Sequence, residues 1–155
     1  MSQSPDPVGG ERGGVVRLSE LEPRTDLPGH PGLSAYRFVR PPEALSRWLL
    51  VTLDVVEHGG GIDLHHHAGL DADHAYYVIE GTVTATIGDE TFEAGPDSLL
   101  VFPSGMRHGL TVTSETGARL LRLGASPTGR ASGGSVFVQE EIAAEEDVER
   151  SPCHH

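Results

Sequence analysis

The feature that most constrains the fold of this chain is a series of short apolar runs separated by turn signals. Many of the runs alternate apolar with polar residues, which is typical of strands that bury one face. Gly, Pro, Asp and Ser residues, which favour turns, fall between them. Many short strands at regular spacing predict an all-β sandwich or closed barrel. The runs are VVRL (15–18), AYRFVR (35–40), WLLVTLDVVE (48–57), IDLHH (62–66), AYYVIE (75–80), TVTATI (82–87), ETFEA (90–94), SLLVF (98–102), GLTVTS (109–114), ARLLRLG (118–124) and SVFVQ (135–139).

The length of 155 residues predicts a single domain, long enough to bury a core without disulfide staples. Residues 1–13 are rich in Gly, Pro and Ser and are expected to be disordered. Residues 14–138 are expected to form the domain with its flanking strands, and residues 139–155 an acidic tail. Only residues 41–48 and 139–150 have a composition compatible with helix.

The net charge of the chain limits the classes of partner that it can bind. Lys and Arg number 11 against 23 Asp and Glu, a net charge of −12, which disfavours binding to nucleic acid and anionic membranes.

The N-terminus lacks the apolar core of a secretion signal, and no run is long enough to span a bilayer. The one cysteine, Cys153, can form no disulfide within the chain. We therefore expect a cytoplasmic protein.

Three consecutive histidines, residues 65–67, lie at the end of the run that begins at residue 62. Side chains on a strand alternate between faces, so His65 and His67 share one face and His66 takes the other. Two imidazoles at this spacing can bind one metal ion at about 2.0–2.1 Å. A cluster without a role in a surface loop is the alternative explanation.

A second segment favours the metal site. The run 98–102 is followed by a Pro-x-Gly turn with Pro103 and Gly105, and His108 then opens the next predicted strand. The turn therefore places a histidine at a strand start, where the interior of a barrel can receive it.

Together the two segments resemble the paired signature motifs of the cupin superfamily, over roughly residues 48–124. The resemblance implies a single-domain double-stranded β-helix, a small jelly-roll barrel with a metal at its centre. The matching residues are His65, His67 and Gly81 in the first motif, and Gly95, Pro103, Gly105 and His108 in the second.

The glutamate of the first motif is missing from this chain. Counting back six intervening residues from Gly81, along a predicted strand, places His74 at its position. Counting forward from His67 instead gives Asp71, with Asp73 as a third alternative, because the intervening loop is longer than the family gap. The backward count favours His74, since a strand fixes its register. By resemblance, the metal ligands are then His65, His67, His74 and His108, and His66 is outside the site.

Four imidazoles are neutral ligands, so this site would be one charge more positive than the usual one. A more positive ion is a stronger Lewis acid toward a carbonyl or enolate oxygen. Imidazole suits zinc, nickel, copper and iron, and the sequence favours zinc, with nickel or iron as alternatives. His30 and His58 lie in loop-like stretches and are expected to be solvated.

Among cupins, the chain resembles the small single-domain cyclases of bacterial aromatic polyketide pathways, through the four histidines and the strand AYYVIEG (75–81). The resemblance implies regioselective aldol cyclisation and aromatisation of a poly-β-keto substrate, free or tethered to an acyl carrier protein. Tyr76, on the predicted face of His74, and Asp63, on the face of His65, are candidate acid–base residues. Ordinary packing or a strand-end hydrogen bond is the alternative role of each.

Two other functions would use the same histidines. One is an iron- or copper-dependent dioxygenase, and the other is a non-catalytic, metal-binding sensory cupin. Such sensory domains often accompany a DNA-binding helix-turn-helix, and the sequence contains no basic helical segment. The flanking strands need a sheet edge to pair with, and resemblance to small cupins implies a homodimer in which they pack on the partner.

Overall fold

The computed structural model describes residues 13–39, 45–46, 48–68, 73–125 and 134–137, without the side chains of residues 67, 68 and 134–137. Within these ranges the chain forms one short 3₁₀ turn, η1 (Leu18–Glu20), and ten strands. The strands are β1 (Leu33–Val39), β2 (Leu49–Val56), β3 (Gly61–Ala68), β4 (Asp73–Glu80), β5 (Val83–Ile87), β6 (Glu90–Ala94), β7 (Leu99–Phe102), β8 (His108–Val112), β9 (Ala118–Ala125) and β10 (Gly134–Phe137).

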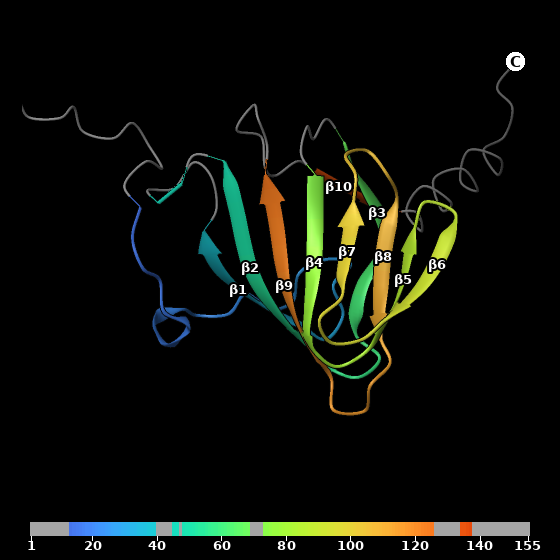
Figure 1. The fold of residues 1–155 in the computed structure, drawn as a ribbon, viewed down its shortest axis with the longest axis horizontal. Coiled ribbons are helices and arrows are strands. Elements are labelled where there is room, and N and C mark those ends of the chain that lie inside the picture. Colours follow the sequence, from blue (N-terminus) through green and yellow to red (C-terminus); the bar gives the residue numbers. More distant parts are fainter. Residues whose placement is uncertain (1–12, 40–44, 47, 69–72, 126–133, 138–155) are drawn as a thin grey trace, which may run out of the picture.

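The strands form two five-stranded sheets that face each other (Figure 1). The first sheet has the order β1-β2-β9-β4-β7, and the second has the order β10-β3-β8-β5-β6. Every strand pair is antiparallel. Chain neighbours such as β3 and β4 lie in different sheets, and this crossing between sheets gives a jelly roll. The predicted all-β jelly-roll barrel is confirmed.

The core lies between the sheets because the strands alternate as the sequence predicts. In β4 and β9, Val78 and Leu120 are fully buried, whereas Ile79 faces outward and is 38% exposed. Burying large aliphatic side chains in this way stabilises the fold by about 1.5–3 kcal/mol for each residue. The principal core cluster is Leu33, Ala35, Val56, Ile62, Tyr76, Val78, Val83, Ala85, Leu100, Phe102, Leu110, Val112, Ala118 and Leu120.

Strand register gathers the histidines at one end of the barrel. His74, in the second position of β4, is paired with Gly124 near the end of β9. In the second sheet, His65 is paired with His108, the first residue of β8. The start of β4, the end of β9 and the start of β8 lie at the same end of the sandwich, the upper end in Figure 1.

The glycine of the first motif closes the turn from β4 to β5. Gly81 has φ 91°, and a Cβ built on it would lie 2.4 Å from the carbonyl oxygen of Gly117. A residue with a side chain would therefore be strained and would clash with the facing loop. This explains physically why the motif requires glycine at position 81.

One predicted strand is absent. Residues 15–17 are irregular, Leu18 begins η1, and Val15 is 73% exposed. The run has β-forming residues but no neighbouring strand to pair with, and a strand needs both. Most of the proposed helical segment 41–48, and all of 1–12 and 139–155, lie outside the described residues. No helix in the described part of the chain has the length and apolar character needed to cross a membrane.

Candidate functional site

The centre of the candidate site is a pair of buried imidazoles from two adjacent strands. His65 of β3 and His108 of β8 are 3% and 5% exposed. Their ring centroids lie 4.4 Å apart, with the ring planes tilted by 57°. The Phe102 ring stacks on the His108 ring, with centroids 4.5 Å apart and 9° between the planes. The two histidines from separate motifs therefore lie together in the barrel interior.

Main-chain carbonyls orient both rings. His65 Nδ1 lies 2.8 Å from the carbonyl oxygen of Asp63, and His108 Nδ1 lies 3.0 Å from that of Met106. A carbonyl oxygen only accepts, so each Nδ1 carries the proton and each Nε2 keeps its lone pair. Imidazoles that bind metals are commonly fixed in this way by a hydrogen bond from the other ring nitrogen.

Burial keeps these imidazoles neutral. It is the largest influence on both residues, lowering the pKa of His65 and bringing the pKa of His108 down to about 4. Neighbouring histidines add to the effect, because the charged forms of His65 and His74 further lower the pKa of His108. A neutral imidazole is the form that binds a metal ion.

His74 lies on the opposite wall of the barrel. It is 8% exposed and packs against Gly124, where an added Cβ would lie 2.8 Å from His74 Cδ2. Its charged form makes a small contribution to lowering the pKa of His108, after burial and the charge of His65. The backbone of His67 pairs with Ser135 of β10, but its side chain lies outside the described residues, as does all of Asp71.

Other predicted residues lie farther from the centre. His66 is only partly buried. Asp73 is exposed, and its Oδ1 accepts a hydrogen bond from the Ser104 amide at 2.9 Å. Among the side chains that the structure describes, no group of three or more His, Cys, Asp or Glu is arranged to hold a metal ion. The donor chemistry nevertheless fits zinc, nickel or iron, because His65 and His108 are neutral and oriented through Nδ1.

Asp63 lies at an irregularity that the sequence did not reveal. The pairing of β3 with β8 shifts between Ile62 and His65, and both of these residues are buried although they are three positions apart. Simple alternation therefore does not apply across residue 63. Asp63 is partly exposed, its amide donates to the Gly29 carbonyl at 2.8 Å, and its charge raises the pKa of His30.

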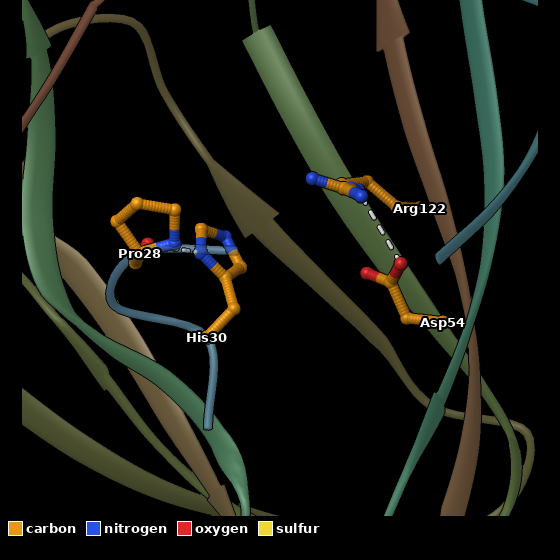
Figure 2. Close-up of polar contacts among 4 residues, drawn as sticks. All are labelled: Pro28, His30, Asp54 and Arg122. Atoms are coloured by element: carbon orange, nitrogen blue, oxygen red, sulfur yellow. Dashed lines mark hydrogen bonds and ion pairs between the residues drawn. The ribbon is translucent and has the colours of Figure 1, made fainter. Parts of the chain in front are cut away.

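His30 is partly buried, and it lies nearer the site than the solvated loop position that the sequence predicted. The segment that contains it runs beside β3, and the His30 ring centroid lies 6.2 Å from that of His65. His30 Nδ1 donates to the Pro28 carbonyl at 2.7 Å (Figure 2). The pKa of His30 is lowered, and the partial burial of the ring is the main reason. No local pattern marks this residue, because the packing of a loop against a distant strand brings it to the site.

A buried ion pair lies deeper in the barrel and was also not predicted. Arg122 Nη2 of β9 donates to Asp54 Oδ1 of β2 at 3.0 Å, and Asp54 is completely buried (Figure 2). Burial raises the pKa of Asp54 to about 6, while the charge of Arg122 opposes the rise. In the sequence, each of these charged residues occupies an inward position of an otherwise apolar strand. That pattern could have indicated a buried ion pair.

Tyr76 lies beside this ion pair on the inward face, at 2% exposure. Burial is the main reason that the pKa of Tyr76 rises above its ordinary value, with a smaller contribution from the charge of Asp54 and opposition from Arg122. The phenol therefore keeps its proton at neutral pH, so Tyr76 can donate a hydrogen bond but is a poor general base.

Comparison with known families agrees with this arrangement. The cupin domain family matches residues 52–124, which include all four predicted ligands and the Asp54–Arg122 pair. The chain contains a cupin domain. No curated protein sequence matches this cupin closely enough to count as a relative.

Solved structures share the fold of this cupin at low sequence identity. The polyketide cyclase RemF from Streptomyces resistomycificus is 20% identical, with a TM-score of 0.65 over 81% of this chain and 84% of its own. KdgF from a Halomonas species is 18% identical, with a TM-score of 0.61 over 73% and 93%. A Thermotoga maritima protein described as a predicted oxalate decarboxylase is 19% identical, with a TM-score of 0.64 over 73% and 99%.

Proposed function

We propose that this cupin is a metal-dependent enzyme that cyclises a poly-β-keto substrate by regioselective aldol condensation and aromatisation, in a bacterial secondary-metabolite pathway. The observation that carries the proposal is the pair of neutral, backbone-oriented imidazoles of His65 and His108 inside an apolar barrel. The shared fold with the polyketide cyclase RemF supports the choice of substrate class. The substrate would be free or tethered to an acyl carrier protein.

In this proposal His65, His67, His74 and His108 hold a divalent ion, with zinc as the first candidate and nickel or iron as alternatives. When bound, the ion would supply Lewis acidity toward a carbonyl oxygen. The protein residues hold the ligands neutral and oriented, because burial and main-chain carbonyls fix the protonation of His65 and His108.

The residues of the barrel walls would supply what cyclisation needs besides a metal ion: exclusion of water, positioning of the substrate and proton transfer. Leu100, Phe102 and Leu110 are buried and apolar, so they would exclude water and hold a flexible chain with its reacting carbons close together. Tyr76 keeps its proton and would donate a hydrogen bond to a developing oxyanion rather than remove a proton. Asp63 remains the candidate base, because its carboxyl group is partly exposed beside His30.

Turnover under controlled oxygen tests the reaction. Zinc- or nickel-loaded protein should cyclise a polyketide mimic at the same rate with and without oxygen, since Lewis acid chemistry needs no redox cycle. Activity that requires oxygen and is confined to iron- or copper-loaded protein would establish the dioxygenase instead.

Metal analysis of ligand variants tests the site separately. His65→Ala and His108→Ala should each weaken metal binding at least about tenfold, because each removes a ligand. His66→Ala is the matched control from the same histidine run and should retain the metal. Loss of metal in Asp71→Ala with full retention in His74→Ala would replace His74 as the third ligand.

A further inference from the structure

We propose that Arg122 binds an anionic oxygen of the substrate, and that this cupin therefore takes an acidic β-keto compound rather than a neutral polyketone. The assignment of the β-keto class rests on the proposed function, whereas the binding of a carboxylate or enolate rests on the surroundings of Arg122 itself.

Arg122 has more hydrogen-bond donors than its structural partners use. A guanidinium presents five N–H donors in a rigid fork that matches the two oxygens of a carboxylate. Asp54 accepts one of them through a single Nη2–Oδ1 contact, and Tyr76 also interacts with the group. Arg122 Nε is buried and forms no hydrogen bond with any described residue. A purely structural ion pair would be expected to use the fork in a bidentate way.

The position of Arg122 suits contact with a bound molecule. It is paired with Tyr76, directly below the layer in which Gly124 meets His74. One fifth of its side chain stays accessible, whereas Asp54 behind it is completely buried. Figure 2 shows the guanidinium extending from Asp54 toward the side of the barrel where His30 lies. Arg122 lies two residues before Gly124 on β9, so it shares the strand face that meets His74.

The charge of Arg122 is secure. Burial alone would lower the pKa of Arg122, but Tyr76 and Asp54 outweigh this effect and the pKa of the guanidinium is raised. Asp54 therefore acts as a positioning residue that holds the cation in the barrel, while the remaining donors face the interior. An anion bound there would lie next to the strand positions of His74 and Gly124, and its β-keto oxygen would point toward the proposed metal site.

Isothermal titration of the full-length protein as purified, near pH 7.5, tests the proposal with two matched probes. Acetoacetate and acetoacetamide share the β-keto group and differ only in a carboxylate against a neutral amide. The wild-type protein should bind acetoacetate at least about tenfold more tightly, the range for a charge-assisted contact. Arg122→Gln should abolish this preference. Arg119→Gln, on the same strand but pointing outward, is the control and should keep it.

Arg122→Gln leaves the buried Asp54 without its partner, which can impair folding. A second variant keeps the comparison decisive in that case. The double variant Asp54→Asn/Arg122→Gln removes both buried charges together, and it should also bind the two probes equally. Equal binding of the probes by the wild type, or a carboxylate preference that survives in either Arg122 variant, would overturn the proposal. The result is independent of turnover, so failure of the cyclase reaction and failure of anion binding are distinguishable.

Discussion

At the scale of single residues, the least expected feature is a carboxyl group with no exposure to solvent in the middle of a barrel. Asp54 has its pKa raised from 3.8 to about 6, chiefly by burial, against the opposing charge and hydrogen bond of Arg122. A carboxyl group that is harder to ionise in the folded state contributes stability below its unfolded pKa. That stability is lost as the pH rises through the folded pKa.

This sign gives a prediction for Asp54→Asn. Between pH 4 and 6 the wild type should lose stability through ionisation of Asp54, whereas the variant has no carboxyl group to ionise. The unfolding free energy of the variant relative to wild type should therefore rise across this range, by on the order of 3 kcal/mol. Urea unfolding at pH 4, 5, 6 and 7 measures it. A difference that stays flat would show that the pKa of Asp54 is unshifted, and one that falls with pH would show that it is lowered.

At the scale of strands, the sequence predicted most of the architecture for a clear physical reason. Alternation and turn residues are local signals, and they placed His74 and Tyr76 on the inward face of β4, where both are buried. These local signals failed to predict features that depend on contacts between residues far apart in the sequence. The irregularity before His65 depends on the pairing with β8, and the position of His30 depends on loop packing. The Asp54–Arg122 pair joins residues 68 positions apart.

The close contact between Gly124 of β9 and His74 of the neighbouring strand β4 gives a second prediction. Gly124→Ala would place a Cβ 2.8 Å from His74 Cδ2 and 3.1 Å from its Nε2, so the imidazole must move. Overpacking of this kind costs about 1–3 kcal/mol, and we expect metal binding to weaken about tenfold if His74 is a ligand. Gly95→Ala is the control, because its nearest neighbour would lie 3.9 Å away. Unchanged metal content in Gly124→Ala, measured by elemental analysis, would contradict the role of His74.

At the scale of the whole molecule, the homodimer stays a prediction. The flanking strands β1 and β10 pair with β2 and β3 within the chain, and each lies at the edge of its sheet. The outer face of the first sheet also exposes aliphatic residues: Leu49, Leu99 and Val101 are 51%, 54% and 49% exposed, and Ile79 is 38% exposed. Exposed aliphatic side chains on one face can contribute to a protein interface.

We therefore expect a homodimer formed through this outer face, with a dimeric mass in light scattering at micromolar concentration. The double variant Leu99→Glu/Val101→Glu should be monomeric, because it would bury two carboxylates in the interface. Phe92→Glu, on the second sheet at 42% exposure, should stay dimeric. A monomeric wild type, or a dimer that the double variant does not disrupt, would place the interface elsewhere or remove it.

The carbonyl groups that hold His65 and His108 have a consequence for how such a site changes in evolution. Because the acceptors belong to the main chain of Asp63 and Met106, replacing either side chain leaves the acceptor in place. Position 106 can then drift in a lineage while the protonation of His108 is inherited unchanged, and a change at position 63 would remove the proposed base without altering the protonation of His65. Insertion or deletion of one residue beside either histidine would instead remove the acceptor. Gaps in the turns, more than substitutions, should therefore separate descendants that keep this site from those that lose it.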